Sequence, residues 1–100
     1  MAKRLIWSPR ALDDLDAILG YVSMDVPQYA KNIARRAFVR ADALTDQPGQ
    51  GRRLFDYGGG REIREVFVHR WRMFYEVSGE EIAILAIIHG ARLLDNSDPL

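Results

Sequence analysis

The sequence contains no cysteine, very little lysine and no apolar run long enough to cross a membrane. Without cysteine it cannot form disulfides, thiolate metal sites or a cysteine nucleophile, and this composition fits a reducing compartment. Its longest apolar run, residues 82–88, has seven residues, whereas a membrane-spanning helix needs about 20. The N-terminal apolar stretch Leu5–Trp7 is too short for a signal peptide. We therefore expect a soluble, cytoplasmic protein with no membrane partner.

The formal net charge is zero, which argues against a broadly cationic surface for nucleic acid. Only Lys3 and Lys31 are lysines, and all other basic residues are arginines. Arginine presents a planar fork that suits phosphates and carboxylates. Acidic residues gather between residues 13 and 25, whereas arginines dominate from residue 35 to residue 72. This distribution allows a locally basic face on a neutral protein.

The chain begins with the pattern of a short strand and a helix. Residues 3–7 are typical of a strand. Ser8 and Pro9 then mark a helix start, because serine caps free amides and proline is tolerated in the first turn. Apolar residues at helical spacing predict a helix as far as Val22, with Asp14 among the acidic residues on its solvent side.

A second helix is predicted from Pro27, with an alanine-rich face that allows close packing. Residues 47–49 end it, and the two helices form an antiparallel hairpin. Residues 49–60 follow as a loop, within which Leu54–Phe55 is a candidate for a very short strand. The three glycines at 58–60 lack the lysine and hydroxyl residue of a phosphate-binding loop.

Three strands complete the chain. Residues 63–68 show imperfect alternation, which suggests a bulge there. Residues 71–77 alternate as a half-buried strand, and Gly79 marks a hairpin turn into residues 82–88, a strand buried on both faces. The order predicts an α+β, two-layer fold: an N-terminal strand and a helical hairpin packed on a mostly antiparallel sheet, with one sheet face partly uncovered. We expect one domain over residues 1–100.

Arg64, Arg72 and Arg92 fall on or after three successive predicted strands. Because neighbouring strands lie about 4.8 Å apart, three such guanidinium groups can converge on one anion, such as an RNA phosphate or a row of carboxylates on a partner. Three separate surface arginines explain the pattern equally well. By alternation, Arg72 lies on the opposite sheet face from Tyr75, so it faces the open side if the aromatic set faces the helices.

His89 follows the buried strand and is a candidate general acid or base. A structural histidine bonded to a loop carbonyl is the favoured alternative, because no carboxylate or tyrosine is clearly placed to work with it. Glu62 and Glu65 are candidates for a base, but an ordinary salt-bridged strand explains them better. His69 falls in a predicted turn and receives no role. The spacing of the two histidines indicates no metal site, and we expect no cofactor.

Several short motifs follow one another along nearly the whole chain: Trp7-Ser8-Pro9-Arg10-Ala11, Asp14-Leu15, Ile18, Tyr21, Pro48, Gly51-Arg52, Arg61-Glu62-Ile63-Arg64, Arg72-Met73-Phe74-Tyr75 and His89-Gly90-Ala91-Arg92. Each is weak alone. In order, spacing and total length, the chain resembles the ParE/RelE superfamily, the toxins of bacterial type II toxin–antitoxin systems.

The resemblance implies the fold predicted above, with residues 82–88 as the central strand. It also implies an antitoxin partner whose C-terminal segment wraps the toxin in a hetero-oligomer. We expect apolar area on the helical hairpin and on the open sheet face to receive that segment. RelE-like members cut mRNA in the ribosomal A site, whereas ParE-like members poison DNA gyrase and are not known as nucleases.

Comparison of the motifs favours the ParE-like branch. Arg72 and Arg92 match RNA-cleaving arginines of RelE-like members, and Arg64 lies near their other basic positions. However, Trp71 replaces a tyrosine of the strand motif, and no tyrosine follows Tyr75. A neutral charge also suits ribosome binding poorly, since that binding relies on phosphate contacts.

The leading hypothesis is therefore a toxin that inhibits DNA gyrase through protein contacts and is not an enzyme; its site residues are unassigned. The first alternative is a ribosome-dependent mRNA endoribonuclease. In that case Arg72 and Arg92 stabilise the scissile phosphate, and His89 or Glu62 moves the proton of the 2′-hydroxyl. The second alternative is a member that has lost toxicity and acts only as a binding and autoregulatory partner.

Overall fold

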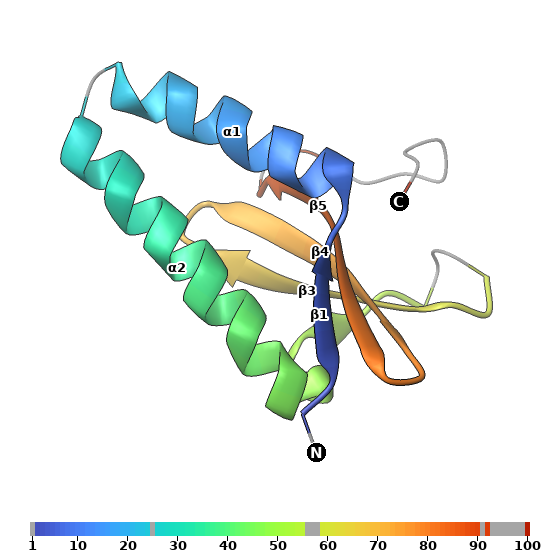
Figure 1. Cartoon of the computed structure of the whole chain (residues 1–100). Coiled ribbons are helices and arrows are strands. Elements are labelled where there is room, and N and C mark those ends of the chain that lie inside the picture. Colours follow the sequence, from blue (N-terminus) through green and yellow to red (C-terminus); the bar gives the residue numbers. More distant parts are fainter. Residues whose placement is uncertain (1, 25, 56–58, 91, 93–99) are drawn as a thin grey trace.

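The protein is a helical hairpin packed on one side of a five-stranded sheet (Figure 1). The computed structural model describes residues 2–24, 26–55, 59–90, 92 and 100. The elements are β1 (Arg4–Trp7), α1 (Pro9–Ser23), α2 (Pro27–Asp46), the short 3-10 helix η1 (Pro48–Gln50), β2 (Arg52–Arg53), β3 (Glu62–Val68), β4 (Trp71–Ser78) and β5 (Glu81–His89). The predicted α+β, two-layer fold is confirmed.

The sheet has the strand order β1-β5-β4-β3-β2. β1 is parallel to β5, and the other neighbouring strands are antiparallel, which confirms the mostly antiparallel prediction. The apolar run at residues 82–88 forms most of β5 and has a strand on each side. The prediction that this run is the central strand is wrong by one position, because only β1 lies beyond it and β4 occupies the middle.

A register shift between β4 and β5 explains why the apolar run of β5 does not alternate. Phe74 pairs with Ala86 and Tyr75 pairs with Ile84, so Leu85 is an extra residue on β5. Ile84 therefore packs with the helices, whereas Ala86 packs on the opposite sheet face. The bulge suggested within residues 63–68 is wrong, because β3 pairs with β4 in unbroken register.

The short strand that precedes β3 also differs from its prediction. It is Arg52–Arg53 rather than Leu54–Phe55, although the N–H of Leu54 still donates to the carbonyl of Ile63 at 2.8 Å. The strand begins earlier because Arg52 is held by an ion pair to Glu65, its partner residue on β3.

Side chains at the start of α1 fasten that helix to β5. The Ser8 hydroxyl accepts the amide of Ala11 and donates to the carbonyl of Leu85, both at 3.0 Å, so the predicted cap is confirmed. Asp14 Oδ2 accepts the N–H of Ile87 at 2.9 Å. The prediction that Asp14 faces solvent is therefore wrong: its carboxylate serves a strand amide next to the bulge.

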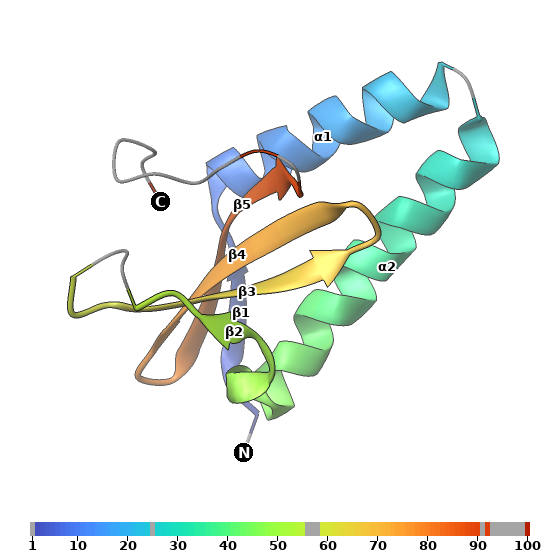
Figure 2. The same ribbon diagram turned by 180° about the vertical axis from the view of Figure 1, so that it is seen from behind.

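A second, smaller hydrophobic cluster lies on the sheet face that the helices do not cover. In the reverse view of Figure 2, neither helix lies in front of strands β2 to β4. Phe74, Ala86 and Ile88 form a small buried cluster there, with Leu54 and Leu100 packed against it. In the part of the chain that the structure describes, neither helix has the length and apolar character needed to span a bilayer.

Candidate functional site

The pairing of β3 with β4 decides which predicted site residues share a sheet face. Arg72 pairs with Phe67 and Ile88, whereas Tyr75 pairs with Arg64. Tyr75 belongs to the core beneath the helices. Directly paired residues lie on the same face and successive residues alternate, so Arg72 lies on the open face, as predicted. Arg64 lies on the helix-covered face.

Arg52, Glu65 and Arg72 form an ion-pair cluster on the open face, here called the Glu65 cluster. Glu65 Oε1 accepts from Arg52 Nη2 at 2.6 Å and from Arg52 Nε at 3.0 Å. Glu65 Oε2 accepts from Arg72 Nη1 at 3.1 Å. Glu65 is only 5% exposed, so its charge depends on these two guanidinium groups. The prediction that Glu65 is salt-bridged is confirmed.

Both terminal nitrogens of Arg72 are bound inside the protein. Besides its contact with Glu65, its Nη2 donates to the carbonyl oxygen of Arg92. Its guanidinium carbon lies 5.1 Å from the centre of the Phe74 ring, and its Nε is buried without a hydrogen-bond partner among the described residues. The side chain is 13% exposed. Arg72 therefore holds the backbone of Arg92 against the sheet and does not present its fork to solvent.

The structure brings Arg72 and Arg92 together but keeps Arg64 apart. Arg64 Nε donates to Glu62 Oε2 at 2.7 Å, and its Nη1 donates to the carbonyl of Gly51 at 2.8 Å. These contacts tie β3 to the segment after η1 on the helix-covered face. The convergence of all three arginines on one anion, which the sequence allowed, does not occur. Glu62 is salt-bridged, as expected.

His89 lies on the side of the sheet opposite to Arg72. It pairs with Trp71, while Arg72 pairs with Ile88, and the His89 and Trp71 rings meet edge to face with centroids 6.2 Å apart. His89 also lines a hollow of about 470 Å³ with Tyr29. It is thus part of a surface near the tip of the helical hairpin and does not share a site with Arg72.

The β3–β4 turn joins this same surface. His69 has a left-handed backbone, with φ of 56°, and its ring lies against Tyr29 on α2. The Tyr29 hydroxyl lies 2.7 Å from His69 Nε2, and the His69 ring centroid lies 6.4 Å from that of Trp71. No role was predicted for His69. Its contact with Tyr29 depends on how helix and turn meet, which no local pattern reveals.

Two glycines of the motifs serve close packing. A Cβ on Gly51 would lie 2.6 Å from the Tyr75 hydroxyl, and a Cβ on Gly90 would lie 2.8 Å from the carbonyl oxygen of Arg70. The N–H of Gly90 donates to that same oxygen at 2.8 Å. No group of three His, Asp or Glu side chains that could hold a metal ion exists among the described residues.

The Glu65 cluster, and Arg52 in particular, was not predicted from the sequence. One signal was available: Glu65 interrupts an apolar strand, and a carboxylate buried in a strand requires a cation. The sequence could not predict which cation this would be, because Arg52 comes close to Glu65 only through the pairing of β2 with β3.

The helical hairpin on a five-stranded mixed sheet, with arginines on the open face, defines a small toxin-like α+β protein of the type that the sequence motifs suggested. The family model described as "ParE toxin of type II toxin-antitoxin system, parDE" matches residues 5–94. The chain therefore belongs to the ParE toxin family of type II toxin–antitoxin systems, and it is a toxin component by family.

Known proteins of similar sequence and fold agree with this assignment. The "Toxin RelE2" of Caulobacter vibrioides is 34% identical over 91 residues, covering 90% of this chain and 98% of that protein. The "Putative toxin Y4kP" of Sinorhizobium fredii is 40% identical over 89 residues, covering 87% and 88%. The structure described as "Chromosomal ParDE TA system from P. aeruginosa" aligns with a TM-score of 0.71 at 24% identity, over 88% of this chain and 96% of that one. At this identity the structural match supports the fold alone.

Proposed function

We propose that this toxin arrests growth by inhibiting DNA gyrase through protein contacts, and that a cognate antitoxin neutralises it in a toxin–antitoxin complex in the cytoplasm. The toxin domain is proposed to span residues 1–100. The family assignment supports an antitoxin partner, because the family is defined as the toxin half of such systems. The names of the relatives do not choose between gyrase and the ribosome.

One observation favours gyrase over the ribosome as the target: the Arg72 guanidinium is already bound by other groups of the protein. A ribosome-dependent nuclease needs a cation free to stabilise the scissile phosphate and a base within reach of the same atoms. Here Arg72 is bound to Glu65 and to the Arg92 carbonyl, and His89 lies on the other sheet face. The neutral net charge also offers little attraction to ribosomal RNA.

The test compares both targets with one protein preparation. Purified toxin is added to a gyrase supercoiling assay, with trapping of gyrase–DNA cleavage complexes, and in parallel to an in vitro translation reaction with mRNA mapped for cleavage. We expect loss of supercoiling and intact mRNA. Cleaved mRNA that appears only when ribosomes are present would instead establish the endoribonuclease alternative.

Arg72→Ala separates the two mechanisms further. If Arg72 clamps a phosphate, a folded Arg72→Ala protein loses RNA cleavage altogether. If Arg72 is structural, the variant loses stability, and gyrase inhibition per folded molecule is retained. If the purified protein shows neither activity, the result would support the second alternative, a family member that has lost toxicity. Antitoxin pairing is tested separately by co-purification with the product of the neighbouring reading frame.

A further inference from the structure

A hollow near the tip of the helical hairpin is lined by aromatic rings. It has a volume of about 470 Å³, which is within the range of pockets that hold small ligands. A ring reaches it from each of α1, α2, β4 and β5, namely from Tyr21, Tyr29, Trp71 and His89. We call it the aromatic hollow. It lies apart from the Glu65 cluster, because His89 and Trp71 are on the helix side of the sheet.

The rings of the hollow combine fixed and exposed positions. Tyr29 is half-buried, and its hydroxyl lies 2.7 Å from His69 Nε2. The Trp71 and His89 rings meet edge to face. Tyr21, in contrast, is 74% exposed on α1. The hollow therefore offers ring surfaces held in place by α2 and the sheet, together with an exposed ring, and planar groups such as nucleobases stack on surfaces of this kind.

Arg70 adds a cation to the hollow. It follows His69 in the β3–β4 turn, lines the hollow and is exposed. It forms no ion pair or side-chain hydrogen bond with any described residue. Its backbone is held in place, since its carbonyl oxygen accepts the N–H of Gly90 at 2.8 Å. An anionic group can therefore bind this guanidinium without displacing a carboxylate of the described chain.

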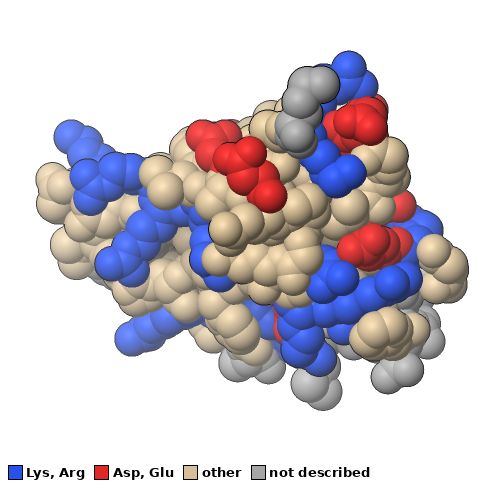
Figure 3. Space-filling model, turned by 90° about the horizontal axis from the view of Figure 1, so that it is seen from below, with Lys and Arg blue, Asp and Glu red and all other residues tan. Residues whose placement is uncertain are grey.

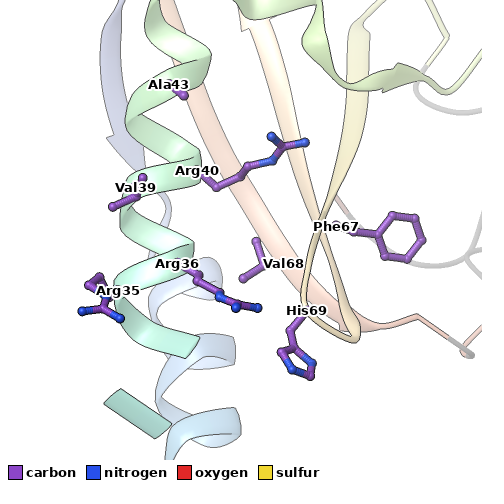
Figure 4. Close-up of a pocket in the computed structure, with 8 residues that line it drawn as sticks. All are labelled: Arg35, Arg36, Val39, Arg40, Ala43, Phe67, Val68 and His69. Carbon is purple, nitrogen blue, oxygen red and sulfur yellow. The ribbon is translucent and has the colours of Figure 1, made fainter. Parts of the chain in front are cut away.

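Further cations follow along α2. His69 contacts Tyr29 and also lines a neighbouring groove of about 490 Å³ between α2 and β3. In Figure 4 the side chains of Arg36 and Arg40 extend from α2 into this groove, toward the strand. Neither arginine has an ion pair among the described residues. The His69 ring thus joins the aromatic hollow to a second group of cations.

The segments that build this end of the molecule are basic. Residues 17–24, 26–41 and 67–71 contain no Asp or Glu and five basic residues, Lys31, Arg35, Arg36, Arg40 and Arg70. Asp25 lies outside the described residues. Figure 3 shows Lys and Arg side chains at the left of the view, where the hairpin tip lies, and acidic side chains farther toward the middle and right. The zero net charge therefore arises from charges that are separated in space, and this end has a locally positive field.

Stacking rings beside free cations match the two parts of a nucleotide, its planar base and its phosphate. Proteins that hold unpaired nucleotides use this combination of aromatic platforms and phosphate-binding cations. We propose that the aromatic hollow binds an unpaired nucleotide, with its base stacked against Tyr21 and Trp71 and its phosphate on Arg70. When the nucleotide is part of a strand, a neighbouring phosphate binds Arg36. This inference does not depend on the gyrase proposal.

The test measures the fluorescence anisotropy of a labelled single-stranded DNA of about 12 nucleotides, a length within the usual range of single-strand binding sites, titrated with the full chain. Tyr21→Ala is expected to weaken binding by about fivefold or more, because one stacking surface is lost. Arg70→Gln should weaken it by about threefold or more. It should also make the logarithm of the binding constant less steep against the logarithm of salt concentration, by about 0.7 for one lost phosphate contact.

Phe55→Ala and Arg4→Gln are the matched controls. Phe55 is 79% exposed, and Arg4 pairs with Glu81 at the opposite end of β5 from His89. Neither residue lines the hollow, so each variant should change the affinity by less than about twofold. Circular dichroism melting checks that every variant folds, and the exposed positions of Tyr21 and Arg70 keep the comparison valid.

Tryptophan fluorescence gives a readout that does not depend on charge. In a Trp7→Phe protein, Trp71 is the only tryptophan left, and a base stacked in the hollow is expected to quench its emission. Adding Arg70→Gln should lower the affinity without changing the quenching at saturation. Binding without any quenching of Trp71 would overturn the inference.

Adenosine monophosphate and duplex DNA complete the set of probes. Tighter binding of the single strand than of adenosine monophosphate supports the inference with a strand as ligand, and equal affinities support it with a free nucleotide. Duplex bound as tightly as single strand, or equal losses in Arg70→Gln and Arg4→Gln, would overturn it by pointing to diffuse charge attraction. Absence of binding to every probe at low salt would also overturn it. Loss of gyrase inhibition in Tyr21→Ala would in that case assign the hollow to a protein contact, whereas the gyrase proposal itself is decided by the supercoiling assay of the wild type.

Discussion

Glu65 and Arg72 form a buried ion pair across strands β3 and β4, with Glu65 Oε2 3.1 Å from Arg72 Nη1. Because both side chains are largely shielded from water, neutralising one leaves the other charge uncompensated. We expect Glu65→Gln to lower the free energy of unfolding by about 3 kcal/mol, near the lower end for a broken buried pair. Urea denaturation with an unchanged m-value measures this.

Arg52→Ala is the control for this cluster. The Arg52 side chain is 70% exposed, and Arg72 still neutralises Glu65 when Arg52 is removed, so Arg52→Ala should cost less than Glu65→Gln, about 1 to 2 kcal/mol. A Glu65→Gln variant as stable as the wild type would show that the cluster contributes nothing to folding.

Gly51→Ala should destabilise the protein by about 1 to 3 kcal/mol through overpacking. The added methyl would lie 2.6 Å from the Tyr75 hydroxyl and 2.7 Å from the Glu65 carbonyl oxygen, and the carbonyl belongs to a strand that cannot move freely. Gly49→Ala, two residues earlier, meets no atom within 4 Å and serves as the control. Equal melting temperatures for the two variants would contradict this packing.

Tyr75→Phe should cost about 1 to 3 kcal/mol, because it leaves two backbone groups without a partner. The Tyr75 hydroxyl donates to the Pro48 carbonyl at 2.7 Å and accepts from the Gly51 N–H at 2.9 Å. These bonds hold the turn after α2 against the sheet. Denaturant titration at neutral pH measures the loss, and Tyr21→Phe on the exposed side of α1 provides the control.

The same residue makes stability depend on alkaline pH. Burial raises the pKa of Tyr75 above its ordinary value of 10.0, although the Gly51 hydrogen bond and the charges of Arg64 and Arg40 act in the opposite direction and Glu62 adds to the rise. The folded state therefore favours the protonated phenol. Its contribution is fully present below about pH 10 and is lost as the pH rises through the folded-state pKa.

Measured between about pH 9 and pH 11, the stability of the wild type should thus fall more steeply than that of Tyr75→Phe. Parallel pH profiles for the two proteins would show that Tyr75 ionises in the folded state as readily as in the unfolded chain.

Asp14→Ala should destabilise the protein by about 1 to 3 kcal/mol, since it deprives the Ile87 N–H of its acceptor beside the β5 bulge. Hydrogen exchange should become faster at the Ile87 amide. Asp13→Ala, on the exposed part of the same helix turn, should change stability by less than about 0.5 kcal/mol. Retained protection of Ile87 in Asp14→Ala would show that another group accepts this hydrogen bond.

Most of the fold followed from local patterns. Ser8 and Pro9 begin α1 because capping and ring geometry act within one turn. The alanines of α2 pack closely, and the run in β5 is buried, because apolar side chains leave water whatever their partners. The errors concern register: the bulge lies at Leu85 on β5, because it is created by how two strands pair and not by the sequence of either one.

Less of the candidate site than of the fold could be predicted from the sequence. Parity within β4 placed Arg72 on the open face, because alternation is a property of a single strand. Strand pairing decided which other arginine lies on the same sheet face as Arg72. Arg52 pairs with Glu65 on the open face, whereas Arg64 pairs with Tyr75 on the helix-covered face. His89 was separated from Arg72 for the same reason, since the register of β5 on β4 sets Ile88 opposite Arg72 and leaves His89 opposite Trp71.

The sequence by itself determined the α+β layering, the helix start at Ser8, the burial of the last strand and, through its spaced motifs, the toxin superfamily. These depend on periodicity, capping and composition, which act over a few residues. Only the tertiary structure decided that Arg72 is bound by Glu65, that His89 lies on the other face, and that Arg36 and Arg40 line a groove whose described lining holds no carboxylate. These facts arise from contacts between segments distant in the chain, where strand register and the docking of α2 set which charges meet.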